Sequence, residues 1–196
     1  MPNALASSSS GDLFEPLWKK LWQSKIPGKV LICAWRACNN ILPTRARLTT
    51  KGYTGPVKCV SCPHEYEDIA HIMYACPLAK DILSRGPLKL SAIMSPIFYF
   101  KEWMLEQALS LSTEKFAKLL MAIWGLSRNR NNTFWSQKPQ SVADILCGTM
   151  AWYHEFVEAT KPLVPKKNQQ TRPRWSPPAV GVLNLNVDGA DCQIPP

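Results

Sequence analysis

Apolar residues recur at helical spacing along the first part of the chain, and prolines separate the segments. Residues 12–26 have apolar positions three and four apart, which predicts a short amphipathic helix. A proline at position 27 suits the first turn of a second helix, which we expect over residues 27–40. A third, short helix is predicted over residues 44–52, where a glycine ends it.

A second helical section follows a Gly-Pro pair. The spacing of its apolar residues predicts helices over residues 97–111, 113–131 and 141–160. The Arg-Asn-Arg run at residues 128–130 is expected to close the middle helix, where cations suit the negative end of the helix dipole. Four tryptophans of this section are expected in its core, namely Trp103, Trp124, Trp135 and Trp152.

The pattern changes again towards the C-terminus. Residues 161–178 contain five prolines and several cations, which predicts a semi-rigid basic linker. Residues 179–196 show partial alternation of Val and Leu, which predicts one β-strand without a partner strand. We therefore expect a mainly α protein with a disordered Ser-rich segment over residues 1–11, a small helical domain over residues 12–84, a helical spacer over residues 85–160 and one orphan C-terminal strand.

Composition narrows the class of protein. With 46% hydrophobic residues and eight tryptophans, the chain can bury a real core. The N-terminal segment lacks the basic flank and apolar run of a signal peptide, and no apolar run approaches the length of a membrane span. Because no segment is long and apolar enough to span a membrane, we expect no membrane partner. Seven cysteines in a chain without a secretory signal fit a reducing, intracellular compartment, so we expect no disulfide framework.

The net charge of +9 is concentrated in one stretch. Between Glu15 and Glu65 there are nine Lys and Arg residues, several Trp residues and no acidic residue. This combination is typical of a phosphate-binding surface with groups available for base stacking, although a solvated basic face is the alternative. The predicted nucleic-acid contacts are Lys19, Lys29, Arg36, Arg45, Arg47 and Lys58.

Three cysteines and a histidine provide the strongest chemical signal. Cys59, Cys62, His71 and Cys76 have the spacing Cys-x2-Cys-x8-His-x4-Cys. Zinc prefers four tetrahedral thiolate and imidazole ligands, and a site with four protein ligands has no position for a reactive water. The pattern therefore predicts a zinc ion that stabilises the fold rather than one that takes part in catalysis.

The sequence around these residues favours a metal site. Asp68 is placed to cap a short apolar helix that carries His71, and Pro77 disfavours helical geometry at Cys76. The alternatives are a core histidine with three buried thiols and a redox-active Cys-x2-Cys pair. His64 is a rival fourth ligand, but its two-residue separation from Cys62 makes joint coordination awkward.

Three blocks of sequence occur in order along the chain. The first contains residues 17–22, 26–30, 34–37 and 42–44 together with Cys59, Cys62, His71, Cys76 and Pro77. The second is Ala122-Ile123-Trp124 with Arg128-Asn129, and the third is Trp175-Ser-Pro177-Pro178 followed by residues 185–190. Together they resemble the end of plant non-LTR (LINE-type) retrotransposon polyproteins, where a zinc-binding region follows the reverse transcriptase, and a helical spacer leads to a ribonuclease H domain.

The resemblance implies a specific role for Asp188. It matches the first-strand aspartate that binds catalytic magnesium in ribonuclease H, but two-metal hydrolysis needs further carboxylates that have no counterpart here. Residues 179–196 thus resemble the truncated start of that domain, and we expect no catalytic activity. A turn aspartate before Gly189 is the plainer interpretation of Asp188.

These observations favour a non-catalytic, zinc-binding fragment of a retrotransposon polyprotein that binds RNA or DNA. The family resemblance implies a nuclear location. Two alternatives remain at this level: a module that docks onto a protein, such as a reverse transcriptase acting in trans, and residual ribonuclease H activity on RNA–DNA hybrids.

Overall fold

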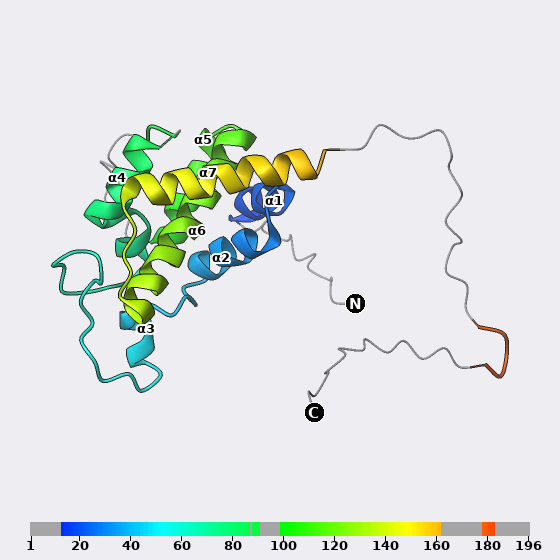
Figure 1. Ribbon diagram of the computed structural model, residues 1–196. Coiled ribbons are helices and arrows are strands. Elements are labelled where there is room, and N and C mark those ends of the chain that lie inside the picture. The colour runs from blue at the N-terminus through cyan, green and yellow to red at the C-terminus, as the bar shows by residue number, and fades with distance from the viewer. Residues whose placement is uncertain (1–12, 87, 91–98, 162–177, 183–196) are drawn as a thin grey trace, which may run out of the picture. The chain divides into compact units, whose positions relative to one another are not determined.

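The computed structural model describes residues 13–86, 88–90, 99–161 and 178–182 (Figure 1). Within these ranges the secondary structure is helical and no strand occurs, so the prediction of a mainly α protein is confirmed. The helices are α1 (Glu15–Gln23), α2 (Gly28–Cys38), α3 (Arg45–Thr49), the π-helical turn η1 (His71–Ala75), α4 (Pro77–Arg85), α5 (Phe100–Ser110), α6 (Thr113–Ser136) and α7 (Val142–Ala159).

Residues 183–196 of the segment predicted to hold the C-terminal strand, including Asp188, lie outside the described residues. The same holds for the predicted disordered segment over residues 1–11 and for nearly all of the predicted linker over residues 161–178. Residues up to Lys161 belong to one compact unit, and the rest of the chain belongs to a second unit. In that second unit, residues 178–182 form a turn in which the backbone N–H of Val182 donates to Ala179 O over 2.9 Å.

The first three helices form where the apolar spacing predicts them. α1 buries Leu17 and Leu21 completely, one turn apart on one face. α2 begins directly after Pro27, which has no N–H to leave unpaired at a helix start. α3 begins after Thr44, whose hydroxyl accepts a hydrogen bond from Arg47 N over 3.1 Å.

α6 is longer than the sequence pattern predicts. Ser112 caps its start by accepting a hydrogen bond from Lys115 N, and the helix continues to Ser136, where Gln137 adopts a left-handed conformation with φ of 51°. The run at residues 128–130 therefore lies inside the helix, and the prediction that its cations close the helix is wrong. Apolar spacing fades after residue 126, so the pattern gave no signal for the last turns.

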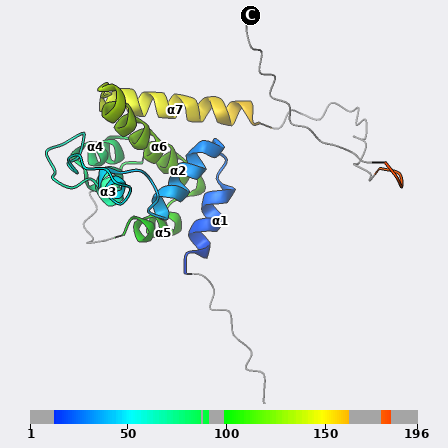
Figure 2. The ribbon, with the colours of Figure 1, turned by 90° about the horizontal axis from the view of Figure 1, so that it is seen from below.

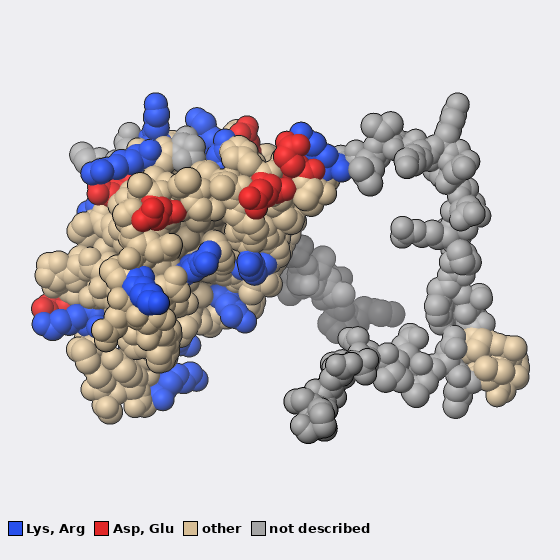
Figure 3. Space-filling view, viewed as in Figure 1, with Lys and Arg blue, Asp and Glu red and all other residues tan. Residues whose placement is uncertain are grey.

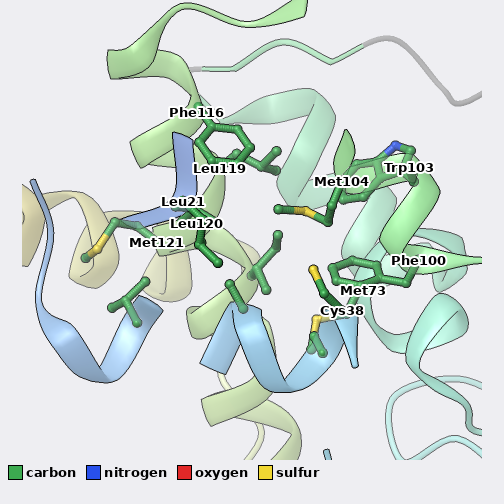
Figure 4. Close-up of a cluster of buried hydrophobic side chains, with 14 of the residues drawn as sticks. Leu21, Cys38, Met73, Phe100, Trp103, Met104, Phe116, Leu119, Leu120 and Met121 are labelled. Atoms are coloured by element: carbon green, nitrogen blue, oxygen red, sulfur yellow. The ribbon is translucent and has the colours of Figure 1, made fainter. Parts of the chain in front are cut away.

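One hydrophobic core joins the two predicted helical sections. Side chains from α1, α2, η1, α5 and α6 converge in it, so the boundary predicted between residues 84 and 85 separates segments that pack together. α6 runs through the middle of the helices and contacts α2, α4, α7 and η1 (Figures 1 and 2). Figure 4 shows part of this core, with the buried side chains of Leu21, Cys38, Met73, Phe100, Trp103, Met104, Phe116, Leu119, Leu120 and Met121.

The four tryptophans predicted as core have different environments. Trp103 is completely buried, and Trp124 and Trp152 are half-buried with their ring centroids 4.7 Å apart. Trp135 is 75% exposed, so its assignment to the core is wrong. It lies in the last turn of α6, where Tyr53 contacts the neighbouring Phe134 with ring centroids 6.4 Å apart. None of the helices in the described ranges combines the length and apolar character needed to span a membrane.

Candidate metal centre

The structure brings Cys59, Cys62, His71 and Cys76 together. Their ligand atoms all lie within 4.8 Å of one another, and Cys62 Sγ is 3.3 Å from His71 Nε2. Tetrahedral zinc with Zn–S bonds of about 2.3 Å and Zn–N bonds of about 2.0 Å places sulfur and nitrogen ligands about 3.5 Å apart. The cluster therefore fits a single zinc ion, and its four ligands would close the coordination shell.

The first two ligands lie in a tight turn. The backbone N–H of Cys59 donates to His64 O over 2.8 Å, which folds the chain back after the Cys-x2-Cys segment. Within the turn, the backbone N–H of Ser61 donates to Cys59 Sγ over 3.3 Å. This bond directs a backbone dipole at the sulfur and stabilises the thiolate that zinc requires. We call residues 59–64 the knuckle.

The other two ligands lie at the two ends of η1. Asp68 caps the start of this segment, because its carboxylate accepts a hydrogen bond from His71 N over 2.7 Å. At the far end, Cys76 has extended geometry (φ −60°, ψ 140°), as expected for the residue before Pro77. Cys76 N donates to His71 O over 2.7 Å, so one π-helical hydrogen bond joins the two ligand residues directly. No local pattern predicts π-helical geometry at this position.

His64 lies beside the cluster but is not one of its members. Its ring stacks on the ring of His71 with the centroids 4.2 Å apart. Its Nδ1 accepts a hydrogen bond from Tyr66 N over 3.2 Å, which ties the ring to its own loop. The structure thus places His71, rather than the rival His64, among the three cysteines.

The close approach of the sulfurs changes the acidity of the thiols. A hydrogen bond from the Cys76 thiol lowers the pKa of Cys59 to about 5, against the opposing effect of burial. The same bond raises the pKa of Cys76, because the proton is held between the two sulfurs. An ion at the centre of the cluster would replace this shared proton, as thiolate ligands require. Cys38, which lies in the core away from the cluster, has its pKa raised to about 12 by burial.

A buried ion pair fastens the knuckle to the helical core. Glu67 is completely buried, and its Oε1 accepts hydrogen bonds from Arg130 Nε over 3.0 Å and from Arg130 Nη2 over 2.6 Å. The same oxygen accepts from Arg45 N over 3.0 Å, and Oε2 accepts from Val60 N over 3.3 Å. One carboxylate therefore connects the knuckle, the start of α3 and the interior of α6.

This pair was not predicted from the sequence, where Arg130 was expected only as a cation at the end of a helix. A signal was nevertheless present, because Arg130 follows Leu126 by four residues and Ile123 by seven, which continues the buried face of α6. A cation on the apolar face of a helix requires a buried partner, and here that partner is Glu67, which lies between Cys62 and His71 in the sequence.

The six predicted nucleic-acid contacts have unequal roles in the structure. Arg45 is half-buried, donates from Nη1 to Lys58 O over 2.9 Å and stacks over the Phe134 ring at 5.0 Å, so it supports the loop before the knuckle. Lys58 forms an exposed ion pair with Glu65 over 3.1 Å. Arg47 is half-buried in α3, whereas Lys19, Lys29, Arg36 and Lys58 are exposed.

Residues 5–82 match the family model described as zinc-binding in reverse transcriptase. No curated protein and no solved structure matches the chain. The match contains all four ligands of the cluster and ends before α5, so the last three helices lie outside it. The family match and the four-ligand cluster together support a reverse transcriptase zinc-binding domain within residues 5–82, held by a structural zinc ion.

Proposed function

We propose that this chain is a non-catalytic module from a retrotransposon polyprotein and that it binds RNA or DNA through phosphate contacts. The observation that carries the proposal is the surface charge of α1, α2 and the loops up to residue 58. The exposed cations there, including Lys19, Lys29 and Arg36, have no acidic neighbour between Glu15 and Glu65 in sequence. Lys and Arg side chains lie over α2 and the neighbouring part of α6, whereas Asp and Glu lie mainly along α7 (Figure 3).

The zinc ion would serve this function indirectly. It fixes the knuckle, and through Glu67 and Arg130 the knuckle is joined to α6. The basic helices α1 and α2 pack into the same core as η1, which carries His71. Zinc binding therefore supports the arrangement of the basic surface without contacting the nucleic acid.

The test is a salt series. Zinc-loaded protein is titrated into fluorescently labelled single-stranded RNA and DNA, and the dissociation constant is measured by anisotropy from low to high salt. Each phosphate contact to a single strand contributes about 0.7 to the slope of log K against log salt. The four exposed predicted contacts, Lys19, Lys29, Arg36 and Lys58, therefore predict a slope of about −3. Weak binding that does not change with salt would refute the proposal.

A second candidate function is docking onto a polymerase in trans. The observation in its favour is a set of exposed apolar side chains on α1 and α2, with Trp22 47% and Trp35 37% exposed. Exposed tryptophans are enriched at protein interfaces as well as at nucleic-acid surfaces. Co-purification with the reverse transcriptase of such an element, retained after nuclease treatment, would favour docking over nucleic-acid binding.

A further inference from the structure

A groove between α2 and α6 gathers cations and amides from two distant parts of the sequence. It has a volume of about 660 Å³. Its lining includes Lys29 and Arg36 from α2, and Arg128, Asn131 and Asn132 from α6. No Asp or Glu is among the described residues that line it.

The spacing of these residues places them along the two walls. Lys29 and Arg36 are seven residues apart, which is two helical turns and about 10 Å along one face of α2. On the opposite wall, Asn131 and Asn132 follow Arg128 by three and four residues, so both amides lie on the same face of α6 as Arg128. The groove thus has donors distributed along its length rather than at one point.

Aromatic rings hold two of the cations in place. Lys29 Nζ lies 4.3 Å from the ring centroid of Trp152 and 5.3 Å from that of Trp124. The guanidinium carbon of Arg128 lies 5.4 Å from the Trp124 ring centroid. A cation over an aromatic face keeps its remaining N–H groups free for an anion, and its side chain loses less entropy when the anion binds.

The charges of the groove are not neutralised by the protein. Across the described ranges, neither Lys29, Arg36 nor Arg128 forms an ion pair with a carboxylate. The acidic residues nearest in sequence to Arg128 are Glu114 and Asp144, which are committed to Lys118 and to the cap of α7 respectively. A recessed surface with three unpaired cations attracts an extended polyanion.

We propose that this groove binds the sugar–phosphate backbone of a single-stranded nucleic acid. Arg36, Arg128 and Lys29 would contact successive phosphates, and the amides of Asn131 and Asn132 would donate to phosphate or sugar oxygens. A recess between two helices admits one strand, whereas a duplex needs a wider surface or an element that enters its grooves. The inference rests on the proposed nucleic-acid binding and adds to it a second wall on α6, outside the residues that match the family model.

The experiment compares two charge-matched variants of the full chain. The groove variant is Arg36→Ala with Arg128→Ala, and the control is Lys80→Ala with Lys115→Ala, which are exposed on α4 and at the start of α6 and do not line the groove. Dissociation constants for labelled oligouridine, oligothymidine and duplex RNA are measured across a salt series. The groove variant should bind both single strands at least about 10-fold more weakly, with a salt slope smaller by about 1.4, and the control should change by less than about 2-fold.

Two further measurements make the test specific. Asn131→Ala with Asn132→Ala should weaken single-strand binding without changing the salt slope, because no charge is removed. Arg36→Lys with Arg128→Lys should keep most of the affinity, and circular dichroism with thermal melting shows that each variant is folded. Duplex RNA should bind wild-type protein more weakly than either single strand.

Each contrary result has a distinct meaning. If the groove variant and the control lose affinity equally, binding is spread over the surface and the groove is not a site, although the proposed function stands. If duplex RNA binds as tightly as the single strands, the single-strand assignment is wrong. If wild-type protein binds no nucleic acid, the proposed function fails, and binding of polyglutamate that depends on Arg36 and Arg128 would assign the groove to an acidic protein instead.

Discussion

Replacing Glu67 by Gln should destabilise the protein more than any surface substitution. The carboxylate accepts four hydrogen bonds, from two nitrogens of Arg130 and from the backbone N–H groups of Arg45 and Val60. A glutamine has the same shape but only one acceptor oxygen. Its NH2 group is a donor, and it would face another N–H donor where the carboxylate has an acceptor oxygen. The Arg130 side chain is only 7% exposed, so its positive charge is then buried without a counter-charge.

The size of the effect follows from this geometry. Removing one partner of a buried ion pair costs about 3–5 kcal/mol, because the other charge stays buried and uncompensated. With a urea m-value of about 2 kcal/mol/M for a domain of this size, the unfolding midpoint should fall by about 2 M. Since Val60 lies within the knuckle, zinc affinity should also fall, by about 10-fold, as found when supporting groups around metal sites are lost.

The assay is urea denaturation of zinc-loaded protein, followed by circular dichroism, with zinc affinity measured by competition with a chelating dye. The matched control is Glu65→Gln, which removes the exposed ion pair with Lys58 and should cost no more than about 1 kcal/mol. If Glu67→Gln and Glu65→Gln shift the midpoint equally, the buried pair does not stabilise the fold and the reasoning is refuted.

Three other perturbations give separate tests. Cys76→Ser should abolish zinc binding and reduce helicity near residues 59–84, and unchanged helicity and melting temperature would show that the metal is not structural. Zinc competes with protons for the thiolates of the cluster, so the urea midpoint of the zinc-loaded protein should fall as the pH is lowered from 8 to 5; midpoints that stay constant over this range would contradict thiolate ligation. Gly125→Ala would bring a methyl group 2.6 Å from Thr149 Cγ2 on α7 and should lower stability by about 1–3 kcal/mol, whereas Gly148→Ala meets no atom within 4 Å and should raise it by up to about 1 kcal/mol; equal effects in thermal melts would show that α6 and α7 are not closely packed.

The features predicted correctly from the sequence depend on local signals. The apolar spacing of α1 and α2 and the capping position of Thr44 act within one or two turns, so a single sequence reveals them. The spacing of the four zinc ligands is local in the same sense, because eighteen residues contain them all. The effect of Pro77 on the geometry of Cys76 is a covalent one and needs no knowledge of the fold.

The features that were missed depend on contacts between distant segments. Glu67 and Arg130 are 63 residues apart, and neither residue alone shows that the other is its partner. Trp135 is an aromatic residue of the type found in cores, but its burial depends on which face of α6 is covered, and there Arg45 and Tyr53 approach Phe134 while Trp135 stays 75% exposed. The packing of the two predicted helical sections into one core also depends on distant contacts, because helical periodicity identifies an apolar face but not the element that covers it.

Native mass spectrometry of the purified chain shows whether a zinc ion holds the fold together. A structural zinc ion predicts a folded species with the mass of one zinc ion per chain, which loses the metal and shifts towards higher charge states when a chelator is added, because residues 59–84 then unfold. A compact, metal-free species that is unaffected by the chelator would contradict the account. A mass lower by two hydrogen atoms, with a peptide map that joins Cys59 to Cys62, would show a disulfide in place of a zinc site.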